Sequence, residues 1–277
     1  MKTYEVQLKE TYKVEGGILK CILMDKPLDN DAFWRRPAMI VVPGGGYGNV
    51  SKREGEPIAA EFLARGYQTF VLTYLCAPSG VRYPEQLIEL ACAVDYVRKH
   101  ADELCVNPDE IFVVGFSAGG HLTANLAVDH QNVSVRAGME LDCRPTAVGL
   151  SYPVITHKTV YQGTHNNLLN GYSDEAKEEL YKEVDLDEVV TENTAPSFIW
   201  TTATDNVVPA ENSLRFALAL ARNKVPYELH IYPEGNHGLS NGALEINHPV
   251  PCLKRLSAWV NECTEFFKRF KEEKSYL

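Results

Sequence analysis

The sequence predicts an α/β fold in which a mostly parallel sheet of eight strands is covered by helices on both faces. Eight short segments have the apolar, β-branched composition of strands, near 4–8, 18–23, 38–42, 68–72, 111–115, 147–151, 198–203 and 228–232. After the second of them, the strands alternate with helical segments near 54–65, 85–101, 117–129, 173–184, 211–223 and 252–270. Such alternation is typical of parallel strands with helices on both sides of the sheet.

Two parts of the chain depart from this alternation. The first two strands are joined through Glu15-Gly16-Gly17, and we expect them to form an antiparallel edge of the sheet. The segment from about 152 to 196, between the sixth and seventh strands, is expected to form a short cap, in which Ser173-Asp174-Glu175 is a typical helix start. The 277 residues, 45% of them hydrophobic, are enough for one large core, so we expect a single domain over residues 1–277.

Composition and charge exclude several classes of function. A net charge of −10 argues against a nucleic acid or an anionic membrane as the partner. The first residues lack the apolar core of a signal peptide and no apolar run could span a bilayer, so we expect a cytoplasmic protein; whether it forms a homo-oligomer stays open. The seven cysteines include no C-x-x-C pair, which favours reduced thiols over disulfides and gives no support to a metal site.

A serine lies at a strand-to-helix elbow in Gly115-Phe116-Ser117-Ala118-Gly119. This is where a nucleophile would be mounted, because the sharp turn exposes the serine hydroxyl. Glycines flank the serine since side chains would collide as the backbone turns. We therefore expect Ser117 to be a nucleophile, with an ordinary glycine-serine turn as the alternative.

A serine hydroxyl needs a histidine to take its proton and a carboxylate to orient that histidine. In this type of fold the chain order is serine, acid, histidine, each after a strand. Asp205 lies just past the strand at 198–203, and His237 follows the strand at 228–232 in a loop that contains glycines. We expect Asp205 as the acid and His237 as the base, with Glu234 and Asp187 as alternative acids.

Two other histidines compete with His237. His121 is near Ser117 in sequence, but four residues along the same helix its side chain would lie over the preceding turn, so we expect it to pack. His230 alternates with Ile231 inside a strand and is expected to be structural.

The glycine run Pro43-Gly44-Gly45-Gly46-Tyr47-Gly48 follows the strand at 38–42. Glycines allow several backbone N–H groups to converge on one oxygen, as an oxyanion hole requires. Ala118, the residue after Ser117, would supply the other donor. The alternatives are a flexible loop and a phosphate-binding loop, although the lysine and Ser/Thr of a P-loop and the spacing of a dinucleotide fingerprint are missing.

With these features the chain resembles the esterase/lipase-like group of the α/β-hydrolase superfamily, which includes small acetyl esterases and sugar-ester deacetylases. The resemblance runs from about Ala38 to Gly238 and is carried by residues 42–47, 115–122, 205–213 and 235–238. It implies that Ser117 is the nucleophile, Asp205 the acid and His237 the base. The oxyanion donors that it implies are Gly45, Gly46 and Ala118. Pro43 stands where many lipase-type relatives have histidine, and Leu75 stands where many members have arginine.

The expected function is a serine carboxylesterase that hydrolyses a small ester through an acyl-enzyme, without a cofactor. The short, charged cap favours a small or soluble acyl group, and the resemblance implies an acetylated sugar or xylo-oligosaccharide as the substrate. Tyr47, Tyr74 and Tyr152 are candidates to line the pocket and stack on a sugar ring, with ordinary packing as the alternative.

Two other functions stay open. A peptidase like the relatives of prolyl oligopeptidase would use the same three residues, but the sequence shows no propeller domain. A ligand-binding protein that has lost catalysis would usually lack one of the three residues, and here all three candidates are present.

Overall fold

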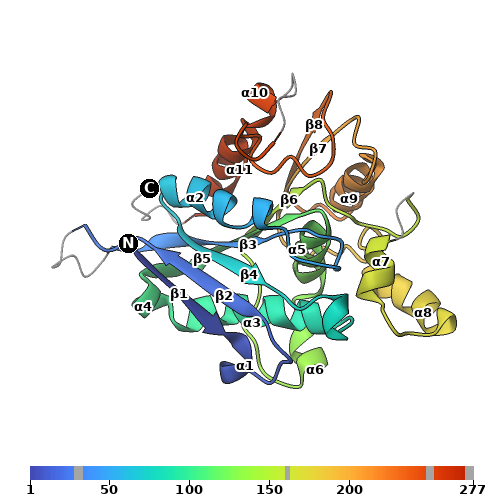
Figure 1. Cartoon of the computed structure of the whole chain (residues 1–277), viewed down its shortest axis with the longest axis horizontal. Coiled ribbons are helices and arrows are strands. Elements are labelled where there is room, and N and C mark those ends of the chain that lie inside the picture. The colour runs from blue at the N-terminus through green and yellow to red at the C-terminus, as the bar shows by residue number, and fades with distance from the viewer. Residues whose placement is uncertain (28–33, 160–162, 248–252, 272–277) are drawn as a thin grey trace.

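The computed structural model describes residues 1–27, 34–159, 163–247 and 253–271. Within them, eight strands form one sheet in the order β1-β2-β4-β3-β5-β6-β7-β8 (Figure 1). The strands are β1 (Lys2–Gln7), β2 (Ile18–Leu23), β3 (Arg36–Val42), β4 (Gln68–Thr73), β5 (Val106–Phe116), β6 (Ala147–Ser151), β7 (Ser197–Thr202) and β8 (Tyr227–Tyr232). β2 pairs antiparallel with both β1 and β4, and the remaining strand pairs are parallel.

The predicted fold class and all eight predicted strands are confirmed, including the antiparallel edge formed by β1 and β2. The largest difference lies in β5, which begins at Val106, earlier than predicted. Its first residues, Val106-Asn107-Pro108-Asp109-Glu110, combine proline with polar side chains and therefore do not have the composition of a buried strand.

Helices lie on both faces of the sheet. They are α1 (Leu8–Thr11), α2 (Glu56–Ala64), α3 (Glu85–Lys99), α4 (Ala101–Leu104), α5 (Ala118–Asp129), α6 (Val133–Ala137), α7 (Gly163–Leu168), α8 (Asp174–Val184), α9 (Glu211–Arg222), α10 (Leu253–Leu256) and α11 (Trp259–Lys268), with 3-10 helices η1 (Lys52–Glu54) and η2 (Ala77–Ser79). The helix predicted near 252–270 is divided into α10 and α11, and Cys252 lies outside the described residues. α1, α4, α6 and α7 were not predicted as helices of their own, because helices this short show no clear periodicity.

The sheet separates two hydrophobic layers. Alternate residues of β3 point to opposite faces, so Ile40 and Val42 pack in the layer that contains α3, α5 and α9, whereas Met39 and Val41 pack in the layer that contains α2 and α11. Figure 1 shows α2 and α11 on one side of the sheet and α3 and α5 on the other. All six cysteines of the described residues are free thiols, as predicted.

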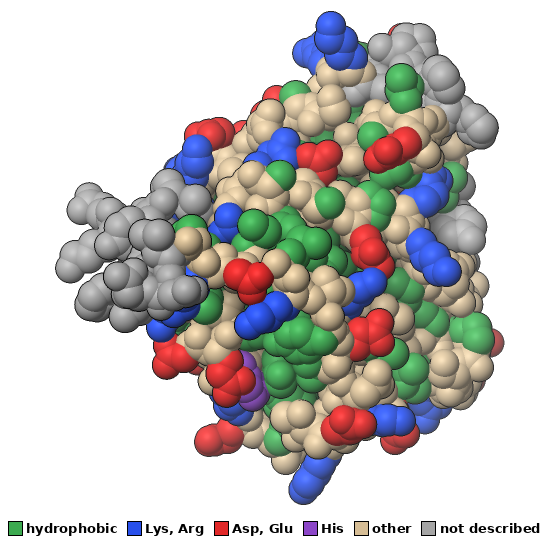
Figure 2. Space-filling view, turned by 60° about the vertical axis from the view of Figure 1, so that its left-hand side comes forward, with side chains coloured by type: hydrophobic (Ala, Val, Ile, Leu, Met, Phe, Trp, Pro, Cys, Tyr) green, Lys and Arg blue, Asp and Glu red, His purple; other side chains and the backbone are tan. Residues whose placement is uncertain are grey.

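The surface in view carries no extended patch of one charge. In Figure 2, Lys/Arg and Asp/Glu side chains are interspersed over the face shown, and hydrophobic side chains gather between them. None of the helices in the described part of the chain has the combined length and apolar character that crossing a bilayer requires.

Trp259 on α11 provides a test of the second layer. Its ring is fully buried and stacks on Trp200 of β7 with ring centroids 5.3 Å apart. Its indole N–H donates to the carbonyl oxygen of Ser240 at 2.9 Å. Trp259→Ala should lower the free energy of unfolding by about 3–5 kcal/mol, because it leaves a large cavity. Chemical denaturation measures this, with Leu218→Ala at a half-exposed position on α9 as a control expected to change stability little.

Candidate active site

The backbone of Ser117 is held in an unfavourable conformation between β5 and α5. Its φ is +53° and its ψ is −115°, which a residue with a side chain rarely adopts. The carbonyl oxygen of Ser151 accepts from its N–H at 3.0 Å, and its own carbonyl oxygen accepts from the N–H groups of His121 and Val154. These bonds fix the turn and expose the Ser117 side chain at its tip.

The glycines around Ser117 are required by space. A Cβ on Gly115 would lie 2.2 Å from the carbonyl oxygen of Gly119, and one on Gly119 would lie 2.2 Å from the carbonyl oxygen of Val42. No side chain fits at either position, which is the physical reason for the glycine pattern of the motif.

The structure brings Ser117, His237 and Asp205 together. His237 Nε2 lies 2.8 Å from Ser117 Oγ, and His237 Nδ1 lies 2.7 Å from Asp205 Oδ2. Asp205 follows β7 and His237 follows β8, so both lie at the carboxyl edge of the parallel strands, as Ser117 does after β5. The side chain of Asp205 is 1% exposed and that of His237 is 17% exposed, so the histidine lies between the buried carboxylate and solvent.

Asp205 is oriented by its own loop. Its second oxygen, Oδ1, accepts from the backbone N–H groups of Val207 and Val208, both at 2.9 Å. With Oδ2 directed at His237 Nδ1, the carboxylate favours the tautomer in which Nδ1 carries the proton. His237 Nε2 is then free to accept the Ser117 hydroxyl proton.

The other candidates for acid and base lie elsewhere. Asp187 pairs with Arg215 at 3.4 Å, and Glu234 is exposed without contacting His237. His121 is fully buried, with Nδ1 2.9 Å from the Tyr47 hydroxyl and Nε2 2.9 Å from the carbonyl oxygen of Val184. Burial lowers the pKa of His121 to about 4, so its ring stays neutral, and its predicted packing role is confirmed. His230 pairs with Glu228 at 2.7 Å.

The glycine loop presents unused donors beside Ser117. Within the described residues, the backbone N–H groups of Gly45, Gly46 and Ala118 form no hydrogen bond, whereas the N–H of Gly44 donates to Glu54 Oε2 at 2.9 Å. Gly45 and Gly46 have φ values of +125° and +62°, and the carbonyl oxygen of Gly46 accepts from Asn167 Nδ2 of α7 at 2.8 Å. The loop is therefore anchored through neighbouring groups, while these three donors keep no partner within the described residues.

Ser117 and His237 line a cavity of about 500 Å³, together with Gly45 and Gly46 of the glycine loop. Its lining includes the polar side chains of Asn49, Ser51, Arg53, Thr164 and Asn167 and the apolar side chains of Val207 and Val208. The remaining lining residues are Gly45, Gly46, Gly48, Glu54, Ser117, His237 and Gly238. α7 thus brings the segment between β6 and β7 into the wall of the cavity.

The three tyrosines that the sequence suggested as sugar contacts lie beneath this cavity and not in its wall. Tyr47, Tyr74 and Tyr152 are all at most 2% exposed. The Tyr47 hydroxyl contacts His121, and the Tyr74 hydroxyl donates to the carbonyl oxygen of Pro43 at 2.9 Å. The apolar core surrounds each ring, and the hydroxyl group of each already has a partner inside the protein. These tyrosines therefore pack in the core, as the alternative interpretation expected.

Glu54 is a site residue that the sequence did not reveal. It is 5% exposed, and its two oxygens accept from the N–H of Gly44 and from the hydroxyl of Tyr152, the latter at 2.7 Å. The Tyr152 hydroxyl in turn accepts from the N–H of Ser240 at 2.9 Å, and its ring packs edge-on against His237 with centroids 5.0 Å apart. Glu54 and Tyr152 therefore connect the glycine loop to the histidine loop.

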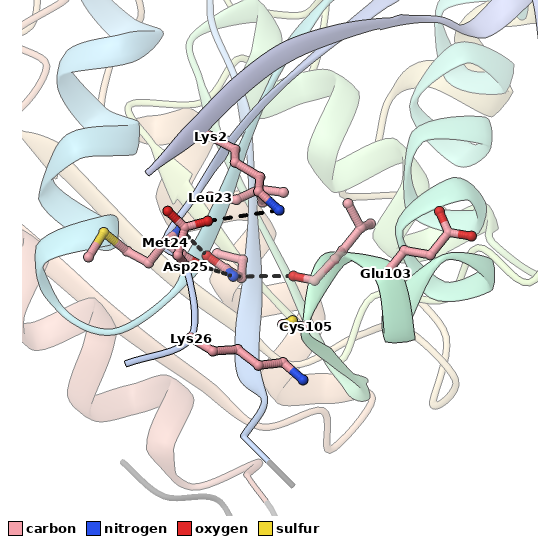
Figure 3. A pocket seen from close by; sticks show the side chains of 9 residues that line it. Lys2, Leu23, Met24, Asp25, Lys26, Glu103 and Cys105 are labelled. Carbon is pink, nitrogen blue, oxygen red and sulfur yellow. Dashed lines mark hydrogen bonds and ion pairs between the residues drawn. The ribbon is translucent and has the colours of Figure 1, made fainter. Parts of the chain in front are cut away.

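A second cavity, of about 350 Å³, lies at the opposite edge of the sheet. Figure 3 shows the side chains that line it, among them Lys2, Asp25, Lys26, Glu103 and Cys105. It lies where β4 and β5 begin, and it contains none of the predicted site residues. Within the described residues, no group of three or more His, Cys, Asp or Glu side chains is arranged to hold a metal ion.

Comparisons with known proteins find relatives over most of the chain. A family model described as BD-FAE matches residues 24–220. Endo-1,4-beta-xylanase B of Butyrivibrio fibrisolvens is 38% identical over 217 residues, which are 77% of this chain and 34% of that protein. Acetylxylan esterase of Xylanibacter ruminicola is 27% identical over 265 residues, which are 94% of this chain and 50% of that protein. The chain thus spans about a third to a half of the length of these curated relatives.

A solved structure is similar over nearly the whole chain. It is an acetyl ester-xyloside bifunctional hydrolase from Caldicellulosiruptor lactoaceticus, with a TM-score of 0.76 and 32% identity. The match covers 92% of this chain and 88% of that one.

The contribution of the Tyr152 hydroxyl to stability can be measured by comparison with Tyr67, whose hydroxyl has no hydrogen-bond partner among the described residues. Tyr152→Phe should lower the free energy of unfolding by about 1–3 kcal/mol, because it leaves Glu54 Oε1 and the N–H of Ser240 without a buried partner. Tyr67 is fully buried and its hydroxyl has no partner among the described residues, so Tyr67→Phe should leave stability unchanged or raise it. Urea denaturation of both variants measures the difference. Equal losses would show that the Tyr152 bonds are not stabilising.

Proposed function

The chain belongs to the BD-FAE family, and we propose that it is a serine esterase that removes small acyl groups, acetyl above all, from hydroxylated alcohols such as xylo-oligosaccharides. The resemblance to the esterase/lipase-like group of the α/β-hydrolases is confirmed by this match and by the similar solved structure. The proposal is carried by the continuous hydrogen bonds from Asp205 through His237 to Ser117 in the wall of a largely polar cavity.

Acylation begins when Ser117 Oγ attacks the carbonyl carbon of the ester. His237 Nε2 accepts the hydroxyl proton as the bond forms, and the ionised Asp205 stabilises the resulting imidazolium. The carbonyl oxygen gains negative charge and is stabilised by the free N–H groups of Gly45, Gly46 and Ala118, which are expected to form the oxyanion hole.

The tetrahedral intermediate then collapses. His237 returns its proton to the leaving alcohol oxygen, and the acyl group stays on Ser117 as an ester. A water molecule enters, His237 removes its proton, and the same steps in reverse order release the acid and restore Ser117. Each proton that leaves a nucleophile is delivered to a leaving group, so the cycle needs no further reactant.

The wall of the cavity supports the proposed substrate class. Asn49, Ser51, Thr164 and Asn167 offer amide and hydroxyl groups, which suit an alcohol with several hydroxyls. One relative is named an acetylxylan esterase and the similar solved structure an acetyl ester-xyloside bifunctional hydrolase, which supports a xylo-oligosaccharide as the alcohol. The small apolar wall of Val207 and Val208 suits a short acyl chain better than a long one.

Replacement of the proposed nucleophile should remove turnover without unfolding the protein. Ser117→Ala is expected to lower ester hydrolysis by several orders of magnitude, because the acyl-enzyme no longer forms. A fluorophosphonate probe followed by intact mass should add one adduct to the unaltered protein and none to Ser117→Ala. Ser51→Ala, which removes another hydroxyl from the same cavity, should still take the label. An adduct on Ser117→Ala would show that the nucleophile is elsewhere.

The length of the acyl chain separates a deacetylase from a lipase. We expect kcat/KM to be highest for 4-nitrophenyl acetate and to fall through the butyrate to the octanoate, because a small pocket excludes longer chains by overlap. A pocket that could bury the added chain would instead gain about 0.8 kcal/mol per methylene. Highest activity on the octanoate, or cleavage of a prolyl peptide faster than any ester, would contradict the proposed substrate class.

A further inference from the structure

Arg53 is a positive charge in the wall of the cavity that holds Ser117 and His237. It belongs to η1, and one of its nitrogens, Nη2, donates to the carbonyl oxygen of Gly238 at 3.1 Å and to Asn247 Oδ1 at 2.7 Å. Its other nitrogens, Nη1 and Nε, form no hydrogen bond within the described residues. The guanidinium group is therefore held from one side, while three of its five N–H groups stay available.

The carboxylates of the site do not neutralise this charge. Glu54 accepts from Gly44 and Tyr152, and Asp205 accepts from His237, Val207 and Val208. Arg53 forms no ion pair in the part of the chain that the structure describes, although the whole chain has a net charge of −10. By contrast, Arg136 contacts both Asp129 and Glu183.

The charge of Arg53 reaches the buried side of the site. Burial raises the pKa of Tyr152 well above its ordinary value, and the charge of Arg53 opposes this rise. Tyr152 packs against His237, and Arg53 itself donates to the carbonyl oxygen of Gly238, the residue that follows His237. A substrate group that pairs with Arg53 would thus lie beside the ester that His237 and Ser117 process.

We propose that Arg53 forms a carboxylate-binding subsite, and that the preferred esters carry a carboxylate on their alcohol part, as an acetylated oligosaccharide with a uronic acid residue does. This inference rests on the proposed function and narrows its substrate class. The planar guanidinium group matches a carboxylate with two parallel hydrogen bonds, which no neutral hydroxyl can form. Arg53 lines the same cavity as Asn49 and Ser51, whose amide and hydroxyl groups suit the alcohol part of the ester.

The anchoring of Arg53 favours such recognition. Because Gly238 and Asn247 already fix one end of the group, binding of a carboxylate costs less side-chain entropy than it would at a free surface arginine.

Two aryl acetates of the same shape test the subsite without a sugar. 4-Acetoxybenzoate carries a carboxylate where 4-acetoxybenzamide carries a neutral amide, and release of the phenol reports hydrolysis of both. The quantity compared is the ratio of kcat/KM for the benzoate to that for the benzamide. The difference in leaving-group reactivity is the same for every variant and therefore cancels when ratios are compared.

Arg53→Gln should lower this ratio about tenfold, the effect of losing one charge-assisted hydrogen-bonded pair. Lys52→Gln is the matched control, because Lys52 is exposed, as Arg53 is, and belongs to the same short helix, but lines a different cavity. It removes the same charge and should change the ratio less than about twofold. Arg53→Lys keeps the charge but not the planar fork, so its ratio should fall between those of the unaltered protein and Arg53→Gln.

The outcomes separate this inference from the proposed function. An equal fall in Arg53→Gln and Lys52→Gln, or no fall in either, would overturn the subsite. If the ratio falls as expected but acetylated xylo-oligosaccharides are not cleaved, the sugar substrate fails and the subsite stands. If Arg53→Gln is inactive on both esters, calorimetry with 4-hydroxybenzoate and 4-hydroxybenzamide in the Ser117→Ala background gives the same ratio from binding alone.

Discussion

The site depends on how closely the backbone of α5 approaches the end of β3. A Cβ on Gly119 would collide with the carbonyl oxygens of Val42 and Pro43, and a Cβ on Gly44 would lie 3.0 Å from the Cβ of Ser117. This approach places the serine at the tip of its turn directly beside the glycine loop, where free N–H groups can face the same atom. The unfavourable φ of Ser117 persists because three backbone hydrogen bonds hold the residue in place.

Buried polar groups then fix the loops around this approach. Glu54, from the segment after the glycine loop, and Tyr152, from the end of β6, share one hydrogen bond and secure Gly44 and Ser240. Both side chains are removed from water, so each unmade bond would carry the full cost of desolvation. Segments that are far apart in the sequence are thereby held at the spacing that the bonds between Ser117, His237 and Asp205 require.

The sequence was sufficient to predict the fold and to find Ser117, Asp205 and His237, because each of the three residues follows a strand of recognisable composition. It could not separate an aromatic ring in a cavity wall from one in the core, so Tyr47, Tyr74 and Tyr152 were placed on the wrong side of the glycine loop. Glu54 was missed for the opposite reason. Its neighbours in Ser51-Lys52-Arg53-Glu54-Gly55 are typical of a solvated loop, and only the tertiary structure buries it. α7 is too short to show a helical period, although it contributes Thr164 and Asn167 to the cavity.

The bond from Asn167 to the carbonyl oxygen of Gly46 has a consequence for how such proteins diversify. The segment between β6 and β7 forms part of the wall of the cavity where the substrate is proposed to bind, and through this bond it also restrains the loop that carries the expected oxyanion donors. Selectivity and chemical competence therefore share a structural element. A segment exchanged from a relative would alter the lining of the cavity and, unless it brought an equivalent donor to Gly46, also the position of the glycine loop. Changes in this segment during evolution are therefore limited by the needs of the reaction as well as by the structure of the alcohol that is bound.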